Sequence, residues 1–221
     1  MLAALYSGGK DSTLAIHRMW EQGKRVELLI TLVSENKFSY MLQRINVNWT
    51  ALQAQAMGVK HAFYNTKGEK EKELVDIEDA LKKYKVTELV TGAVASKYQA
   101  DRINRICDGL GITHYSPLWG MDPLMELGEI SAKFNAIVTQ VAAEGFDDSM
   151  LGARIDERLI GKLQTLHRKY RINMSFEGGE AESFVLDAPL FKKRIVINKA
   201  RKEWNGSVGA YIIEEAELAE K

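Results

Sequence analysis

The chain has 221 residues, 46% of them hydrophobic and 27% charged, which is typical of a globular protein and excludes collagen-like and disordered classes. Lysine plus arginine and aspartate plus glutamate each number 30, and this zero net charge argues against strong nucleic-acid binding. Residues 28–33 form the longest apolar run near the front, too short to cross a membrane, and no signal peptide is expected. Cys107 is the single cysteine, which excludes an internal disulfide and favours a cytoplasmic location.

Short apolar runs alternate with amphipathic stretches over residues 1–115. Strands are predicted at residues 2–6, 26–33, 61–64, 88–94 and 112–115, and helices at residues 12–22, 49–57, 69–83 and 103–110. Three of these helices stop at a glycine (Gly23, Gly58 or Gly111), a residue that favours the left-handed cap. Strands separated by helices indicate βαβ units. We therefore expect an α/β fold with a doubly wound, parallel, five-stranded sheet in the order 3-2-1-4-5.

The regular alternation is lost near Pro117 and Pro123, which predicts a domain boundary near residue 120. Residues 121–221 are then expected to form a smaller α+β domain beside the domain of residues 1–120. Residues 129–144 have mixed periodicity, and residues 158–170 predict a helix. Residues 184–213 predict strands, with a hairpin turn at Asn205-Gly206.

A basic cluster lies in this predicted hairpin. Its members are Lys192, Lys193, Arg194, Lys199, Arg201 and Lys202. These side chains could bind nucleic acid, but we favour cross-strand pairing with acidic residues of the opposite strand. The expected partners are Glu214, Glu215 and Glu217.

The segment Ser7 to Ser12, Ser-Gly-Gly-Lys-Asp-Ser, connects the first predicted strand to the first predicted helix. Open α/β sheets bind ligands at this end of their strands. Two glycines let the backbone approach an anion, which free N–H groups and the positive end of the helix then hold. The two serine hydroxyls and the ammonium of Lys10 would add to this cradle. The spacing differs from a Walker A loop and from the G-x-G-x-x-G pattern. A turn that only caps a helix is the less favoured interpretation.

This loop resembles the pyrophosphate-binding loop (PP-loop) of the N-type ATP pyrophosphatases, which split ATP between its α and β phosphates. Four later segments narrow the resemblance to the diphthine–ammonia ligase family, and together they span almost the whole chain. They are Ser34-Glu35-Asn36 with Ser39-Tyr40-Met41, residues 92–102, residues 117–120, and residues 177–191. Three positions depart from the family pattern: Phe176 stands for a usual glycine, Ala181 for an aromatic residue and Ser183 for a threonine. These departures bear on the shape of the acceptor pocket, the part of the site that would bind the substrate other than ATP.

The resemblance implies an adenine nucleotide α-hydrolase-like, Rossmann-type fold in a compact archaeal form, without the additional C-terminal domains of eukaryotic enzymes. It implies an ATP-dependent amide ligase that adenylates the carboxylate of diphthine on elongation factor 2. AMP and pyrophosphate are released, and ammonia then gives diphthamide. ATP and Mg²⁺ are the implied cofactors. Elongation factor 2 and ammonium are the implied partners, and a homodimer is one possible assembly.

The resemblance also assigns site residues. Those implied for ATP binding are Ser7, Gly8, Gly9, Lys10, Asp11, Ser12, Leu32, Val33 and Gly92. Those implied for substrate binding are Ser96, Tyr98, Gln99, Arg102, Gly178 and Gly179. Catalytic roles are expected for Lys10, Asp11, Glu177, Glu180 and Glu182. Lys10 would stabilise charge on the leaving pyrophosphate, and the glutamates would hold Mg²⁺, orient ammonium or act as a base.

Without the family resemblance, the sequence leaves a second interpretation open for Ser96 and for the three glutamates. Ser96 could simply cap a helix, and the three glutamates could form a solvated acidic turn. The histidines lack metal-ligand spacing, so packing or surface roles are expected for His17, His61, His114 and His167. Cys107 falls on an apolar helix stripe and is expected in the core.

Two other functions stay as alternatives. One is a tRNA-modifying enzyme with the same loop, which the zero net charge and the single cysteine disfavour. The other is a non-catalytic ATP-binding protein of the universal-stress type. The glycine-rich loop of that class normally follows the fourth strand, whereas here it follows the first.

Overall fold

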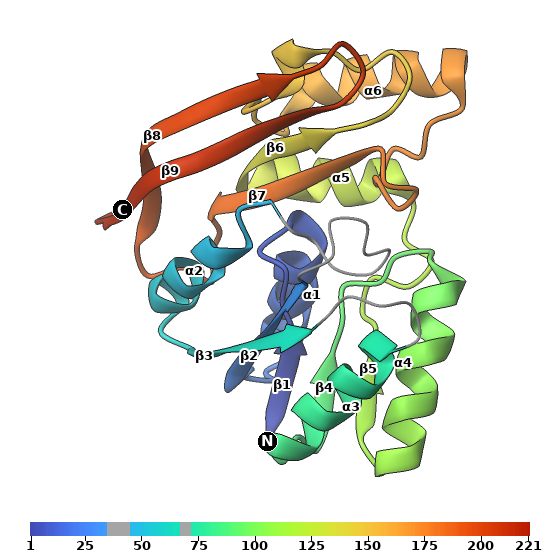
Figure 1. Cartoon of the computed structure of the whole chain (residues 1–221), viewed down its shortest axis with the longest axis vertical. Helices are drawn as coiled ribbons and strands as arrows, with labels where there is room; N and C mark the ends of the chain where they lie inside the picture. The colour runs from blue at the N-terminus through green and yellow to red at the C-terminus, as the bar shows by residue number, and fades with distance from the viewer. Residues whose placement is uncertain (35–44, 67–71) are drawn as a thin grey trace.

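The structure, a computed structural model, describes residues 1–34, 45–66 and 72–221 (Figure 1). Its first half contains a parallel sheet of β1 (Leu2–Leu5), β2 (Leu28–Ser34), β3 (Lys60–Thr66), β4 (Glu88–Val90) and β5 (Thr113–Tyr115). The strand order is β3-β2-β1-β4-β5, with every pair parallel. The predicted doubly wound sheet and its strand order are confirmed.

Helices cover both faces of this sheet. They are α1 (Lys10–Glu21), α2 (Thr50–Met57), α3 (Lys72–Lys83) and α4 (Lys97–Leu110). The side chains of β1 alternate between the two faces, since Ala4 packs with α1 and α2 whereas Ala3 packs with α3 and α4. Cys107 is buried in the α3–α4 core, as predicted, and burial raises the pKa of its thiol to about 11.

The second half contains an antiparallel sheet in the order β7-β6-β9-β8. Its strands are β6 (Asn135–Val141), β7 (Ala181–Asp187), β8 (Arg194–Trp204) and β9 (Gly209–Ala219). Helices α5 (Pro123–Lys133) and α6 (Glu157–Tyr170) pack with it. The chain also has two short 3₁₀ helices, η1 (Val47–Trp49) before α2 and η2 (Asp148–Met150) before α6. In Figure 1 this sheet lies over the end of the parallel sheet at which β1 leads into α1.

The mixed periodicity of residues 129–144 has a structural explanation. This range contains the end of α5 and all of β6, so a helical period and a strand period overlap in it. The start of α5 was missed, although Asp122 caps the helix by accepting hydrogen bonds from the N–H groups of Leu124 and Met125, and Pro123 occupies the first turn. A carboxylate cap followed by proline was a usable signal in the sequence.

The predicted strand region of residues 184–213 is three strands that begin earlier and end later than expected. The turn at Asn205-Gly206 is confirmed, and the side chain of Asn205 accepts hydrogen bonds from the N–H groups of Ser207 and Val208. Two members of the basic cluster pair across this hairpin, because Lys199 and Arg201 both reach Glu214, at 3.2 and 3.1 Å. This arrangement agrees with the favoured cross-strand interpretation.

The two sheets share one hydrophobic core. Residues of β1 and α1, such as Leu2 and Leu14, belong to the same buried cluster as Phe184 and Ile213 of the second sheet. The boundary near residue 120 stays a prediction, because two sheets that share a core do not by themselves define separate domains. Within the described ranges, no helix has both the length and the apolarity that crossing a membrane requires.

Candidate nucleotide and acceptor site

The loop of residues 7–12 begins where β1 ends, and its backbone conformation depends on two glycines. Gly8 has a φ of +81°, and a Cβ atom at this position would lie 2.4 Å from Oε1 of Gln53. A Cβ atom at Gly92, which follows β4, would lie 2.6 Å from the backbone N of Ser12. Gly92 therefore packs directly against the loop, and any side chain there would displace the loop backbone.

Strand β7 of the second sheet holds this loop in place. The carbonyl of Gly8 accepts hydrogen bonds from the N–H of Val185, at 3.0 Å, and from Nε2 of Gln53, at 2.9 Å. The hydroxyl of Ser183 accepts from the backbone N–H of Lys10 at 3.0 Å. Sequence reasoning found the loop but not these partners, which lie far along the chain.

A cavity of about 1120 Å³ lies between the loop and the antiparallel sheet. Its walls on the side of the parallel sheet come mainly from residues 5–7, 9–12, 30, 32, 91–93, 99, 100 and 103. Its volume suits a ligand of nucleotide size, since small-molecule sites usually measure roughly 300 to 1,000 Å³. Of the residues implied for ATP binding, Leu32 and Gly92 line it, whereas Gly8 and Val33 are not among its lining residues. Residues 35–41, which include most of the Ser34–Met41 resemblance segment, lie outside the described residues.

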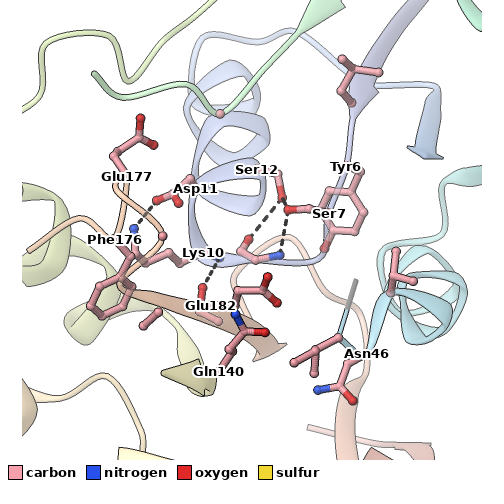
Figure 2. Close-up of a pocket in the computed structure, with 18 of the residues that line it drawn as sticks. Tyr6, Ser7, Lys10, Asp11, Ser12, Asn46, Gln140, Phe176, Glu177 and Glu182 are labelled. Atoms are coloured by element: carbon pink, nitrogen blue, oxygen red, sulfur yellow. Dashed lines mark hydrogen bonds and ion pairs between the residues drawn. The ribbon is translucent and has the colours of Figure 1, made fainter. Parts of the chain in front are cut away.

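One row of the antiparallel sheet forms the opposite wall. Glu182 of β7 pairs with Gln140 of β6, Gln140 with Ala210 of β9, and Ala210 with Glu203 of β8. All four residues line the cavity, so their side chains project from the same face of the sheet. Figure 2 shows Glu182 and Gln140 beneath the loop that carries Ser7, Lys10 and Ser12. Gln140 and Glu203 were not predicted, because a polar residue in a strand is usually solvent-exposed.

The ammonium of Lys10 lies away from solvent rather than free in the cradle. Nζ of Lys10 contacts Asp11 and Glu126, each at 2.5 Å, and donates to the carbonyl of Ser175 at 2.9 Å. Burial alone would lower the pKa of Lys10, but the charges of Asp11 and Glu126 raise it above its ordinary value. Lys10 is therefore a buried cation that faces two carboxyl groups.

Asp11 and Glu126 share this single cation, and their environments differ. The side chain of Asp11 is 29% exposed, yet burial of its carboxyl group raises its pKa well above the ordinary range. The positive charge of Lys10 lowers this pKa, and the negative charge of Glu126 raises it further. Burial by itself would raise the pKa of Glu126, but Lys10 and hydrogen bonds from Asp11, Lys10 and Ser175 lower it. Glu126 is thus the stronger anionic partner of Lys10.

The three predicted glutamates do not converge. Glu177 accepts hydrogen bonds from the N–H groups of Ser96, at 2.9 Å, and Ala95, at 3.3 Å. Strand β7 begins at Ala181, so Glu180 lies before the strand and does not share its face with Glu182. The carboxylate of Glu180 instead accepts from the N–H groups of Asn173 and Gly178, each at 2.8 Å. Of the three, Glu177 and Glu182 line the cavity, together with Gly178 and Gly179.

The predicted substrate segment at the start of α4 is divided between the cavity and another surface. Ser96 caps α4 by accepting from the N–H of Gln99, and Gln99 lines the cavity. The guanidinium of Arg102 stacks on the ring of Tyr98, 3.4 Å from its centroid, so the two side chains share a face of α4. Arg102 borders a separate hollow of about 280 Å³ formed with α3.

His17 is buried, His61 and His114 are half-buried, and His167 is exposed. His61 and His114 bond to Thr31 and Thr91, each at 2.9 Å, and His167 bonds to the carbonyl of Ile172 at 2.6 Å. His17 lies near Glu21 and Glu129, the one group of three potential metal ligands among the described residues. Nζ of Lys133 already occupies the centre of this group, at 2.8 Å from Glu21, 3.0 Å from Glu129 and 3.4 Å from His17.

Comparison with known proteins adds to this geometry. The sequence profile of the diphthamide synthase N-terminal domain matches residues 1–114, and that of the diphthamide synthase C-terminal domain matches residues 122–219. The Homo sapiens protein named diphthine–ammonia ligase is 31% identical to this chain, over 90% of this chain and 83% of its own length. The Saccharomyces cerevisiae protein of the same name is 26% identical, over 86% of this chain and 33% of its own length. The match therefore covers most of the human relative and only a third of the yeast relative, so a long additional region is not common to all eukaryotic relatives.

Among solved structures, the chain resembles a protein of Methanocaldococcus jannaschii described as a predicted subunit of tRNA methyltransferase. The two are 15% identical with a TM-score of 0.45, over 85% of this chain and 97% of the other.

Proposed function

We propose a function from the premise that this chain belongs to the diphthamide synthase family. The chain is an ATP-dependent diphthine–ammonia ligase, which converts diphthine on elongation factor 2 to diphthamide. One observation carries the proposal: a phosphate-binding type of loop and a row of polar side chains face each other across one cavity. This arrangement provides a place for a nucleotide and a place for an acceptor at the same reacting centre.

The chemistry proceeds in two steps. In the first, the carboxylate of diphthine attacks the α-phosphate of ATP, the bond to the β-phosphate breaks, and pyrophosphate leaves. In the second, ammonia attacks the acyl carbon of the adenylate and AMP leaves with the electron pair of the broken C–O bond. The attacking nitrogen must lose a proton, so a base near the acyl carbon is required.

The loop provides the phosphate contacts in this proposal. Ser7 and Ser12, whose hydroxyls lie 3.3 Å apart, line the cavity at the positive end of α1, where N–H groups of a loop can bind an anion. Gly8, Gly9 and Gly92 allow the backbone to approach the phosphates closely. Adenine would lie over the end of β2, beside Leu32 and Val33.

Mg²⁺ fits the same end of the cavity. Asp11 lines it beside the loop, and Mg²⁺ is usually held by one or two carboxylates together with the phosphates of the substrate. Bound there, Mg²⁺ would neutralise part of the phosphate charge.

The acceptor side of the cavity is assigned to the antiparallel sheet and the acidic segment. Glu182 is the proposed base, or the group that orients ammonium, because it lies in the sheet row that faces the loop. Gln99, Gly178 and Gly179 are proposed contacts of the acceptor. Ser96, Glu177 and Glu180 support this surface through backbone hydrogen bonds, and Tyr98 and Arg102 would contact elongation factor 2 farther from the reacting atoms.

The remaining parts of the proposal concern the setting of the enzyme. We assign residues 1–120 to nucleotide binding and residues 121–221 to the acceptor. A cytoplasmic location is supported by the single buried Cys107, which needs no oxidising compartment. The tRNA-modifying alternative has no specific support, because the net charge is zero and Lys199 and Arg201 of the basic cluster are paired with Glu214.

The test is a reaction of the protein with ATP, ammonium and diphthine-bearing elongation factor 2. We expect AMP, pyrophosphate and a modified histidine whose mass corresponds to replacement of the hydroxyl of the acid by an amino group. Elongation factor that lacks diphthine is the control and should give no amide. ADP and phosphate as the main products, or an unmodified elongation factor, would contradict the proposal.

A further inference from the structure

Glu126 of α5 has no role in the function proposed so far, yet it is completely buried. Its Oε1 accepts from Nζ of Lys10 at 2.5 Å, and its Oε2 accepts from the hydroxyl of Ser175 at 2.6 Å. A buried carboxylate is unfavourable unless it is paired and hydrogen-bonded, and here both oxygens are bonded. The carboxylate therefore fixes two groups, one from the loop and one from the segment before the acidic turn.

Lys10 and Glu126 together hold Ser175 at two points. Nζ of Lys10 binds the carbonyl of Ser175, while Glu126 binds its hydroxyl. The next residue, Phe176, has a φ of +65°, a conformation that bulky residues rarely adopt. Its ring lies 5.4 Å from Nζ of Lys10, close enough for a cation–π contact. The chain direction after Ser175 is thus set by contacts to the buried ammonium.

The segment that follows carries the acceptor side of the cavity. Glu177 reaches the start of α4, and Glu182 lies in the sheet row opposite the loop. Residues 177–179 line the cavity between these two glutamates. A displacement of Ser175 and Phe176 would move this cavity wall, whereas the phosphate loop has its own bonds to Ser183, Val185 and Gln53.

We propose that Glu126 is a positioning residue, which acts through Lys10 and Ser175 to fix residues 175–182 opposite the phosphate loop. Lys10 then serves as a buried anchor of the acceptor wall. The inference rests on the proposed function for its activity measurement only, because the order of residues 175–182 can be measured without a reaction.

The first experiment compares Glu126→Gln with wild type. The substitution keeps the size of the side chain and an acceptor for Ser175, but it removes the charge that faces Lys10. We expect the rate of amide formation at saturating substrates to fall at least ~10-fold, while the KM for ATP changes less than ~3-fold. Calorimetric ATP binding should keep a stoichiometry near one site per chain, which a partly unfolded sample would not. Glu129→Gln, on the same helix but in the Arg18 and Lys133 ion pairs, is the matched control and should behave as wild type.

Amide hydrogen exchange provides the readout that does not depend on activity. In Glu126→Gln, exchange of residues 173–180 should rise at least ~10-fold while that of β6 stays unchanged. A double variant, Lys10→Met with Glu126→Leu, then distinguishes positioning from stabilisation. An apolar pair of similar volume can restore the thermal midpoint of a buried ion pair, but it cannot bind the carbonyl and hydroxyl of Ser175. We expect the midpoint to recover and the amidation rate to stay low.

Three results would overturn the proposal. The first is unchanged exchange of residues 173–180 in Glu126→Gln, because the segment would then not depend on Glu126. The second is increased exchange with full amidation, and the third is recovery of amidation in the double variant. If wild type itself makes no amide, the proposed function fails, and the exchange result alone then supports or overturns the role of Glu126 in fixing the segment.

Discussion

The hydroxyl of Ser183, on β7, accepts a hydrogen bond of 3.0 Å from the backbone N–H of Lys10, in the first turn of α1. Two residues farther along β7, the N–H of Val185 donates to the carbonyl of Gly8. The first N–H groups of a helix have no partner within the helix, and here one of them is bonded by the second sheet. The conformation of the phosphate loop therefore depends on a strand that lies far away in the sequence.

Substitution of Ser183 tests this dependence. Ser183→Ala should lower the free energy of unfolding by about 1 to 3 kcal/mol, because the N–H of Lys10 would be buried without an acceptor. ATP affinity, measured by calorimetry, should fall with it. Ser183→Thr keeps the hydroxyl and should bind ATP as wild type does. Equal ATP affinity in all three proteins would mean that the hydrogen bond has no part in shaping the loop.

Gly92 offers a steric test of the loop. In Gly92→Ala the new Cβ atom would lie 2.6 Å from the backbone N of Ser12 and 2.7 Å from the carbonyl carbon of Asp11, so the loop must move. We expect ATP affinity to fall at least ~10-fold and stability to fall by about 1 to 3 kcal/mol. Gly161→Ala, within α6, is the matched control, because nothing lies within 4 Å of its Cβ position. That variant should bind ATP normally and be slightly more stable, since alanine favours a helix. Normal ATP binding by Gly92→Ala would show that the loop tolerates the displacement.

Glu182 and Glu180 are predicted to have different roles, the first in catalysis and the second in stability. Glu182→Gln should leave ATP affinity nearly unchanged and reduce amide formation by ~10²- to 10⁴-fold, the usual effect of losing a catalytic base. Glu180→Gln should mainly lower the thermal midpoint, because its carboxylate binds the N–H groups of Asn173 and Gly178. Calorimetry, mass spectrometry of the elongation factor and thermal unfolding measure these three properties. The assignment of Glu182 would be wrong if its variant amidated at the wild-type rate.

Three histidines, of which His17 is buried and His61 and His114 are half-buried, predict loss of stability in mild acid. Burial lowers the pKa of His17, His61 and His114 below the ordinary value of 6.5. Below about pH 6.5 the unfolded chain therefore binds more protons than the folded chain, and the free energy of unfolding falls with pH. Stability is fully present above this pH and is lost as the pH decreases toward the lowered values.

The matched variant for this prediction is His61→Asn. Its free energy of unfolding in urea should change less between pH 7 and pH 5 than that of wild type, because one of the three groups is missing. The raised pKa of Asp11 acts in the opposite direction in both proteins, so the difference between them isolates His61. Identical slopes in the two proteins would contradict the prediction.

The parallel sheet was predictable because its signals are local. Apolar runs alternate with helical stripes, and Gly58 and Gly111 end two of the helices in the left-handed conformation. The loop of residues 7–12 was predictable for the same reason, since two glycines between a strand and a helix have few other uses. The start of α5 was a missed local signal, because Asp122 and Pro123 mark it.

The partners of the loop were not predictable from local signals. Glu126 stands beside Leu127 and Ile130 on a helix, and a carboxylate at a buried position would have drawn attention once that helix was recognised. Its pairing with Lys10 depends on the packing of α5 against α1, which no local pattern contains. The same holds for Glu180, whose role as a backbone acceptor follows from the path of residues 173–180 rather than from its spacing to Glu182.

The bonds that complete the loop also have a consequence for synthesis of the chain on the ribosome. Gly8, the N–H of Lys10 and the ammonium of Lys10 find partners at Val185, Ser183, Glu126 and Ser175, all of them translated after the parallel sheet. A nascent chain that ends before β7 has every residue of the phosphate loop and the partners Glu126 and Ser175, but it lacks the contacts of the loop with Ser183 and Val185. We therefore expect full nucleotide affinity only once translation has passed β7, and a truncated product should not compete with the finished enzyme for ATP.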